Sequence, residues 1–450
     1  MQFTTQKPSK KLHLVSLGCT KNLVDSEIML GKLAEYEMTN DGSDADVIIV
    51  NTCGFIDSAK QESLNTIFDL HDQRKDDSVL VMSGCLSQRY QEELQKDLPE
   101  VDIFTGVGDY DKIDEMVRQK QSKFTNEVFL ATDTNERVIT GSSYHAYVKL
   151  SEGCNQTCSF CAIPSFKGKL HSRTLESLVK EVKSLVSKGY KDITFISQDS
   201  SSFLRDQGIN DGLEKLVEEI EKVEGIKTAR ILYLYPSTTT LSLIDKIADS
   251  KVFVNYFDMP LQHISKNMLK VMKRGKKFEK LHELMSYMKS KPNSFVRTTF
   301  IAGHPGETEE DFEELCKYVK NFGFDRANVF SYSDEEGTSA FEMEDKIEQE
   351  IIDQRAEVLG EVIETTTQKS LESEIGETFE VYVDGESDEH EYLLSARKTI
   401  WAPDIDGEIY INDNELIDEN GETSQIKFGE IYTVKVTELV GDKLLATVIK

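Results

Sequence analysis

The chain has 450 residues, of which 38% are hydrophobic and 30% charged, so it is long enough for several domains and too apolar for a disordered protein. With only 8 prolines and 26 glycines, collagen-like and low-complexity classes are excluded. Acidic residues outnumber basic ones by 81 to 52, and the net charge of -29 gives a surface that repels nucleic acid and attracts basic partners.

Neither a membrane segment nor a disulfide framework is predicted. No run reaches the ~18–20 consecutive apolar residues of a membrane span, and the first residues lack the apolar core of a secretory signal. We therefore expect a cytoplasmic protein. Seven cysteines are too few for a disulfide scaffold, and an odd number in a non-exported chain indicates thiols that bind a metal or act in catalysis.

The first hundred residues predict an open parallel sheet. Three apolar runs that are typical of buried strands each end in a cysteine: LHLVSLGC at 12–19, VIIVNTC at 47–53 and VLVMSGC at 79–85. The segments between these runs have the spacing of helices. Because the carboxyl ends of parallel strands meet at one edge, Cys19, Cys53 and Cys85 can converge on a cluster or metal. One such cysteine is usually just a small buried side chain, but three in succession, each beside a glycine, favour a site.

From about Tyr144 the sequence alternates strand-like runs with amphipathic helices. The six runs span 145–153, 192–199, 229–236, 254–261, 296–306 and 326–333. Six alternations predict an incomplete (β/α)6 barrel, related to the eight-unit TIM form, with its active site at the strands' carboxyl ends. Cys316 falls between helix-spaced apolar residues and is expected in the core. A charged segment at 344–372 predicts a long helix that acts as a spacer and packs on one face.

After about Ser373 the hydrophobic period changes to two. Five short runs, at 379–385, 391–397, 407–413, 431–439 and 443–450, predict a small antiparallel barrel of the OB or a related type. Residues 373–450 hold 19 acidic and 6 basic residues, a local charge of -13. The overall class is therefore α/β with a small C-terminal β-barrel, and the expected domains are 1–138, 139–372 and 373–450.

The most specific motif is EGCNQTCSFC at 152–161, in which Cys154, Cys158 and Cys161 have the spacing CxxxCxxC. Three thiolates in one loop can hold three irons of a 4Fe-4S cluster and leave the fourth iron without a protein ligand. With this spacing the open iron is expected to bind S-adenosylmethionine, so that an electron from the cluster can release a deoxyadenosyl radical. The alternative is a zinc site, for which His171 is the nearest fourth ligand.

This loop resembles that of the radical S-adenosylmethionine (radical SAM) superfamily. The three-part layout resembles the methylthiotransferases over essentially the whole chain, with an N-terminal methylthiotransferase domain, a radical SAM core and a C-terminal TRAM barrel. The resemblance implies S-adenosyl-L-methionine and two 4Fe-4S clusters as cofactors. It assigns the catalytic radical cluster to Cys154, Cys158 and Cys161, and an auxiliary cluster to Cys19, Cys53 and Cys85.

Three further segments at strand ends resemble the same family. Gln198 and Asp199 follow the second core run, Gln262 and His263 lie in PLQH after the fourth, and Gly303 lies in TFIAGHPGET after the fifth. By position and by analogy, these residues are expected to contact the cofactor. Simpler alternatives are a tight turn at the glycines of GHPG and a hydrogen-bonded core histidine.

Three side chains depart from the usual family pattern. The segment after the motif reads AIPSFKGKLHSR, with Lys167 and His171 where arginine is common. His304 stands where an apolar or aromatic residue is common.

The family has two main branches, one acting on an adenosine of transfer RNA and the other, RimO, on an aspartate of a small-subunit ribosomal protein. The segments SLGCTKNLVDSE at 16–27 and WAPDIDG at 401–407 resemble the RimO branch. The acidic charge points the same way, because RNA binding needs clustered Lys and Arg, whereas a basic ribosomal protein is attracted to an acidic surface. Trp401 is either a partner anchor or a barrel core residue.

The resemblance therefore implies a transferase that attaches a methylthio group to the β-carbon of an aspartate in ribosomal protein S-twelve. An electron donor is a further expected partner, and direct RNA binding is not expected. Methylthiolation of a transfer RNA adenosine and a non-catalytic metal-binding docking protein are the alternatives. The mechanism requires that the N-terminal strand ends face the mouth of the barrel and that the acidic tail place a basic loop between them.

Overall fold

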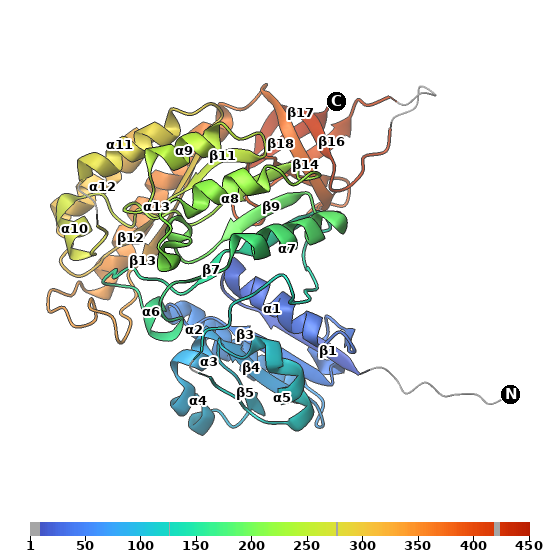
Figure 1. Ribbon diagram of the computed structural model, residues 1–450. Helices are drawn as coiled ribbons and strands as arrows, with labels where there is room; N and C mark the ends of the chain where they lie inside the picture. Colours follow the sequence, from blue (N-terminus) through green and yellow to red (C-terminus); the bar gives the residue numbers. More distant parts are fainter. Residues whose placement is uncertain (1–9, 126, 276–277, 418–423) are drawn as a thin grey trace.

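The structure, a computed structural model, describes residues 10–125, 127–275, 278–417 and 424–450. Its elements form three units that follow one another along the chain (Figure 1). The N-terminal α/β unit lies at the bottom of the view, the α/β core occupies the middle, and the C-terminal barrel lies at the upper right.

The N-terminal unit is a five-stranded parallel sheet in the order β2-β1-β3-β4-β5. Its strands are β1 (Lys11–Ser16), β2 (Glu37–Met38), β3 (Val47–Thr52), β4 (Val79–Gly84) and β5 (Ile103–Phe104). Its helices are α1 (Thr20–Lys32), η1 (Gly42–Asp44), α2 (Asp57–Gln73), α3 (Cys85–Arg89), α4 (Gln91–Asp97), η2 (Tyr110–Lys112) and α5 (Ile113–Gln119). The three predicted strands are confirmed. The two-residue strands β2 and β5 were not predicted, because they are too short for a periodic signal.

The core is a six-stranded parallel sheet in the order β13-β12-β11-β10-β9-β6. Its strands are β6 (His145–Lys149), β9 (Asp192–Ile196), β10 (Thr228–Ile231), β11 (Phe253–Asp258), β12 (Phe295–Ala302) and β13 (Arg326–Ser331). The edges β6 and β13 do not pair, so the predicted incomplete barrel is confirmed. The predicted run 145–153 breaks after β6, and its end forms a hairpin of β7 (Ser151–Glu152) with β8 (His171–Ser172).

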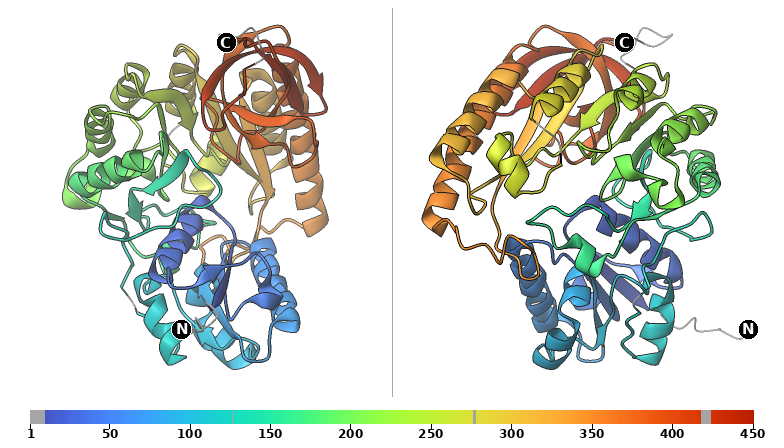
Figure 2. Two further views of the ribbon diagram at one scale, coloured as in Figure 1. Left: turned by 90° about the vertical axis from the view of Figure 1, so that its right-hand side faces the viewer. Right: turned by 60° about the vertical axis from the view of Figure 1, so that its left-hand side comes forward.

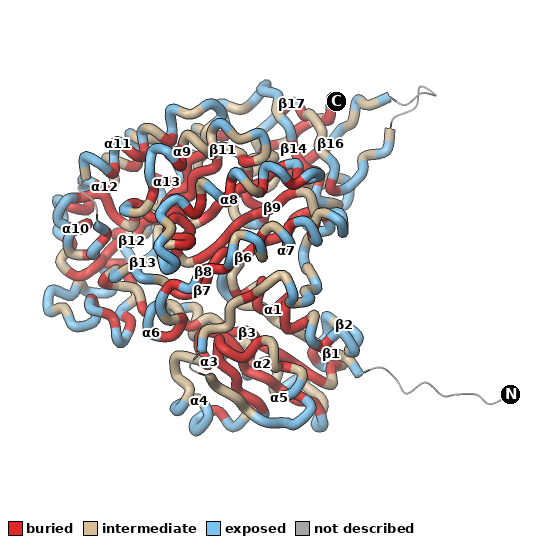
Figure 3. Tube along the Cα trace, in the orientation of Figure 1, coloured by how far each residue is buried: buried red, intermediate tan, exposed pale blue. Residues whose placement is uncertain are grey.

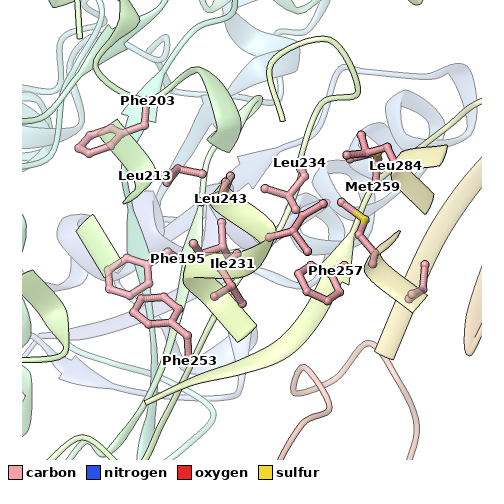
Figure 4. Close-up of a cluster of buried hydrophobic side chains, with 14 of the residues drawn as sticks. Phe195, Phe203, Leu213, Ile231, Leu234, Leu243, Phe253, Phe257, Met259 and Leu284 are labelled. Atoms are coloured by element: carbon pink, nitrogen blue, oxygen red, sulfur yellow. The ribbon is translucent and has the colours of Figure 1, made fainter. Parts of the chain in front are cut away.

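Helices cover the outer face of the core sheet. They are α7 (Leu175–Ser187), η3 (Ser200–Ser202), η4 (Arg205–Gln207), α8 (Gly212–Ile220), α9 (Leu241–Ala248), α10 (Lys266–Val271), α11 (Phe278–Lys289), α12 (Glu309–Phe322) and α13 (Gln349–Glu372). The short helix α6 (Ile163–Phe166) instead packs against α3 of the N-terminal unit. Figure 4 shows Phe195, Ile231 and Phe257 of the strands packed with Leu213 and Leu243 of the helices. Side chains alternate between the two faces of a strand, so the residues between these apolar ones point to the inner face. Many of those inner residues are polar, and several of them are buried. That inner face is available for a site.

Helix α13 differs from the predicted spacer. It begins at Gln349 instead of residue 344, and its Leu359 and Ile363 belong to the same apolar cluster as the core strands. The helix packs against β12, β13 and α12, so it is the last helix of the outer layer. Cys316 on α12 is half-buried and packs against the same cluster, as the sequence predicts.

The C-terminal unit is a closed barrel in the order β14-β15-β16-β18-β17. Its strands are β14 (Thr378–Glu386), β15 (Leu394–Lys398), β16 (Ile409–Asn414), β17 (Ile431–Val440) and β18 (Lys443–Val448). The predicted small antiparallel barrel is confirmed, and within it one pair of strands, β16 and β18, runs parallel. Five strands in a closed ring cannot alternate in direction all the way round, so one parallel pair is unavoidable.

The barrel docks on the inner face of the core sheet, in the amino-terminal half of the strands. Arg397 Nη2 donates to Asp192 Oδ2 at 2.5 Å, and Arg326 Nε donates to the Asp406 carbonyl at 2.7 Å. Trp401 is only 2% exposed, with its ring 5.1 Å from the Arg326 guanidinium. The partner-anchor alternative for Trp401 is therefore wrong, because this interface buries the indole. The docking leaves the carboxyl-terminal half of the inner face to the N-terminal unit.

Burial follows this layering (Figure 3): both sheets and the barrel run through buried segments, and exposed segments lie on the outer helices and loops. Among the helices in the described part of the chain, none has both the length and the apolar character that a membrane crossing requires.

Candidate active site at the strand ends

Three cysteines of the N-terminal unit lie at the carboxyl ends of three adjacent strands. Cys19 follows β1 and precedes α1, Cys53 follows β3, and Cys85 is the first residue of α3, directly after β4. Gly18 has a φ of +83°, and a Cβ placed on it would lie 2.8 Å from the Cys53 sulfur. The β1 and β3 loops therefore approach each other so closely that only glycine fits at this position.

These three thiols also influence one another electrostatically. Burial raises the pKa of Cys85 to about 12, while Lys167 opposes this shift and Cys19 and Cys53 reinforce it. Burial likewise raises the pKa of Cys53. Bound iron supplies the positive charge that deprotonates such thiols, so this trio suits a metal cluster better than free nucleophilic chemistry.

The second trio lies in the loop after β7, and several contacts fix that loop. Gly153 has a φ of +71°, and the backbone N–H of Cys154 donates to the Gly168 carbonyl at 3.1 Å. Ser159 Oγ and His304 Nε2 lie 2.8 Å apart and form a buried hydrogen bond. His304, which departs from the family pattern, thus anchors the middle of the cysteine loop.

The cysteines of this loop are partly buried, and one of their sulfur atoms lies beside a cationic side chain. Arg274 Nη1 donates to the Cys158 sulfur at 3.2 Å, and the Tyr235 hydroxyl lies 3.5 Å from the same atom. Burial raises the pKa of Cys154 and that of Cys161 to about 12. A guanidinium beside the sulfur stabilises the negative charge that a thiolate brings to a cluster. No motif in the sequence pointed to Arg274, which follows α10.

The arrangement does not suit a single metal ion. Within residues 10–125, 127–275, 278–417 and 424–450, no three His, Cys, Asp or Glu side chains are placed to hold one ion. His171, the fourth ligand of the zinc alternative, is exposed on β8. Zinc needs four ligands that converge on one ion, whereas each thiolate of a 4Fe-4S cluster binds its own iron, so three thiolates without a fourth protein ligand suit the cluster better.

Two of the predicted cofactor contacts offer free acceptors at strand ends. Gln198, after β9, donates from Nε2 to Glu152 Oε2 at 3.1 Å, and its Oε1 is buried without a partner. Gln262, after β11, has a φ of +70° and a buried Oε1 that also lacks a partner. Buried acceptors without partners and a strained non-glycine backbone are typical of ligand sites. Both residues therefore fit a bound cofactor.

The other predicted contacts have structural partners. Asp199 Oδ2 accepts from Gln156 Nε2 at 2.7 Å and so braces the cysteine loop. His263 is fully buried, and its Nδ1 accepts from the Ser265 backbone N–H at 3.0 Å. Gly303 has a φ of +85° and forms part of the turn after β12. Contact of these three residues with the cofactor stays a prediction. The geometry also fits the simpler alternatives, in which His263 is a hydrogen-bonded core histidine and Gly303 makes a tight turn.

The two cysteine trios face each other across the domain boundary. Lys21, two residues after Cys19, places its Nζ 3.4 Å from the centroid of the Tyr233 ring. Tyr233 follows β10 and has a φ of +62°. The N-terminal strand ends therefore meet the carboxyl ends of the core strands, as the mechanism requires. Lys21 lies in the segment 16–27 that the sequence analysis singled out, but no role was predicted for it, and no motif pointed to Tyr233.

A second contact closes the opposite side of the boundary. The loop after β13 carries the buried Glu335, which accepts from Lys60 Nζ at 3.1 Å and from Arg89 Nη1 at 2.6 Å. The right-hand view of Figure 2 shows this orange segment reaching the blue N-terminal unit. The cysteine loops thus lie between two interdomain contacts.

Three family models match the chain in succession. Residues 11–106 match Uncharacterized protein family UPF0004, residues 148–319 match the Radical SAM superfamily, and residues 375–449 match the TRAM domain. A solved radical S-adenosylmethionine methyltransferase, TsrM from Kitasatospora setae, shares the fold at a TM-score of 0.52 and 14% identity, over 72% of this chain and 74% of its own.

Fold, motif and family models together define a radical SAM protein with a TRAM domain. Sequence relatives are more specific. A protein of Aliarcobacter butzleri named ribosomal protein uS12 methylthiotransferase RimO is 79% identical over 100% of both chains, and one of that name from Sulfurovum sp. is 64% identical over 98% of this chain and 99% of its own. The chain belongs to the RimO family of radical SAM methylthiotransferases.

Proposed function

We propose that the chain is the enzyme that attaches a methylthio group to the β-carbon of an aspartate in ribosomal protein uS12. The observation that carries this proposal is the 79% identity, over the whole length, to a protein named for uS12 methylthiolation. The two facing cysteine trios supply the sites that such a reaction needs. A charge of -29 opposes the alternative substrate, transfer RNA, and favours a basic ribosomal protein.

The enzyme uses two 4Fe-4S clusters and S-adenosyl-L-methionine, which when bound supply an electron, a methyl group and a radical that removes hydrogen from an unactivated carbon. We assign the radical cluster to Cys154, Cys158 and Cys161, and the auxiliary cluster to Cys19, Cys53 and Cys85. The glycine at the close approach of the cysteine loops and the free amide oxygens of two glutamines support this assignment.

The chain's own side chains have positioning tasks in this scheme. Arg274 balances charge at the Cys158 sulfur, and the bond between Asp199 and Gln156 braces the cysteine loop. Gln198 and Gln262 offer their free amide oxygens to polar hydrogens of the cofactor.

Domain limits, partners and location complete the proposal. The limits are 1–138 for the auxiliary-cluster domain, 139–372 for the radical SAM core and 373–450 for the TRAM domain. An electron donor is a required partner, since cofactor cleavage consumes an electron. Its substrate is made in the cytoplasm, and we place the enzyme there.

Mass spectrometry of ribosomal proteins tests the function directly. In cells that carry the gene, uS12 is expected to show the added mass of a methylthio group on one aspartate, and in cells without the gene this mass is expected to be absent. A radioactive methyl group from the cofactor is expected in protein. Its appearance in RNA instead would select the transfer RNA branch and reject the proposal.

A substitution of Gly18 tests the auxiliary site. We expect Gly18→Ala to lower iron and sulfide from about eight to about four per chain, since the new Cβ would collide with Cys53. Gly189→Ala is the matched control, because Gly189 has a φ of +100° and nothing within 4 Å of an added Cβ. Full iron content in Gly18→Ala, or equal loss in both variants, contradicts the assignment.

A further inference from the structure

Four buried charges join helix α1 to the loops on either side of the second cysteine trio. They are Asp25 on α1, Lys149 at the end of β6, Glu152 on β7 and Lys167 after α6, and none is more than 3% exposed. Lys149 Nζ donates to Asp25 Oδ1 at 2.5 Å and also to Glu152 Oε1. Lys167 Nζ lies 3.6 Å from Asp25 Oδ2 and 3.6 Å from Glu152 Oε2. Two ammonium and two carboxylate groups thus alternate in a closed ring, the interdomain quartet.

The quartet connects the two cysteine trios by a short path. Asp25 lies on the helix that begins directly after Cys19. Glu152 stands two residues before Cys154 in the sequence, and Lys167 stands six residues after Cys161. Lys167 is also close enough to Cys85 to influence it electrostatically. Each trio is therefore tied to the same four charges through chain segments of only a few residues.

Buried ion pairs are better suited to fixing the relative position of two domains than to increasing the stability of the fold. Taking four charges out of water is costly, and apolar side chains of similar size are often at least as stable in such places. Ion pairs with hydrogen bonds, however, fix distance and direction, whereas apolar contacts tolerate sliding. The interface between α1 and β6 is bordered by apolar residues such as Val24 and Ile28, which do not by themselves define one register.

One further contact extends the quartet to the cofactor site. Glu152 Oε2 accepts from Gln198 Nε2 at 3.1 Å, which fixes the side-chain amide and leaves its Oε1 buried without a partner. The Glu152 carboxylate therefore has two kinds of partner. It binds the lysines of the interdomain quartet, and it holds the side-chain amide of Gln198, a candidate cofactor contact.

We propose that the interdomain quartet is a positioning device that holds the two cluster-binding loops at one separation and orientation. This inference rests on the proposed function, in which a sulfur held at one trio must meet a carbon activated at the other. Such a transfer depends steeply on distance, and a misplacement of about 1 Å can cost about 100-fold in rate. Replacing Lys149 leaves the bond between Glu152 and Gln198 in place, so the substitution is expected to impair transfer between the sites and to spare cleavage of the cofactor.

The test compares Lys149→Met with wild type in the full-length protein reconstituted with iron and sulfide. We expect both clusters to remain, and the magnetic interaction between the two reduced clusters, measured by pulsed electron paramagnetic resonance, to change. Methylthiolated uS12 formed per cofactor cleaved is expected to fall by about 100-fold, with cofactor cleavage retained. The double variant Asp25→Asn with Lys149→Met removes one charge of each sign and so leaves no extra unpaired carboxylate in the quartet. It replaces the single variant in the test if Lys149→Met does not fold.

Arg137→Met is the matched control. The Arg137 side chain is also buried and also bonds to α1, donating to Glu27 Oε2 at 2.6 Å, but its other ionic partner is Glu181 on α7, which is not a member of the quartet. We expect this variant to keep both the magnetic interaction and the product ratio. The positioning role is overturned if Lys149→Met leaves both readouts unchanged, if Arg137→Met alters them equally, or if iron is lost in both quartet variants.

The magnetic readout needs no substrate, so it separates this inference from the function. Absence of methylthiolated uS12 with wild-type enzyme rejects the proposed function. An unchanged interaction in the quartet variants rejects the positioning role alone.

Discussion

Replacing Cys154, Cys158 and Cys161 together with alanine is expected to reduce cleavage of S-adenosylmethionine to an undetectable level. On the proposed assignment this loop would hold the cluster that supplies the electron for cleavage, and an acid or a base cannot replace an electron donor. Iron and sulfide are expected to fall from about eight to about four per chain, because the N-terminal trio remains. Cofactor cleavage products measured under anaerobic reduction, together with iron and sulfide analysis, check this result.

Cys316→Ala is the control for thiol loss. Cys316 lies half-buried on α12 and outside both trios, so this variant is expected to keep about eight irons and full cleavage. Persistence of cleavage in the triple variant would show that the radical cluster is held elsewhere. Loss of all iron would show that the trios do not bind independently.

The complementary variant replaces Cys19, Cys53 and Cys85 with alanine. We expect it to keep cofactor cleavage and about four irons per chain, but to form no methylthiolated uS12. The radical loop is anchored by Gly168, Ser159 and His304 of the core, so it does not depend on the N-terminal thiols for its shape. Mass spectrometry of uS12 after incubation with the variant is the measurement.

Two outcomes would contradict this division of labour. Formation of product by the second triple variant would remove the need for an auxiliary cluster. Loss of cofactor cleavage in that variant would mean that the N-terminal trio takes part in the first step of the chemistry, or that the domain interface fails without it. Circular dichroism and thermal unfolding of both triple variants distinguish a chemical loss from unfolding.

The core sheet separates two tasks between the halves of its inner face. The amino-terminal half is filled by the C-terminal barrel through buried ion pairs such as Arg397 with Asp192. The carboxyl-terminal half meets the N-terminal unit and its thiols, with Lys21 reaching Tyr233. The C-terminal barrel thus covers the amino-terminal end of the core sheet. The barrel also carries the acidic charge that suits a basic partner.

Much of this architecture was predictable from the sequence. Cysteine spacing at 154–161 and cysteines at the ends of three apolar runs are local patterns, and they identified both trios. Period-two and period-3.6 alternation located the strands and most helices, because burial of one face imposes those periods on any chain. The exceptions were the two-residue strands β2, β5 and β8, the break between β6 and β7, and the first residues of the segment 344–372.

Other features depended on which faces meet. The burial of Trp401, the parallel pair β16 and β18, and the packing of α13 into the core follow from closure and docking of whole units. Sequence periodicity predicts which face of a helix or strand is buried, but it does not predict which other element packs against that face.

The chain by itself thus determined the chemistry: two sets of thiols, a radical SAM loop and an acidic surface. Only the tertiary structure decided how those thiols are held, through Arg274 beside Cys158 and through the pairing of Lys149 with Asp25, 124 residues apart. The physical reason is that a ligand set is a matter of residue type and local spacing. Buried charge pairing instead depends on contacts between segments far apart in sequence, and these exist only once the domains have packed.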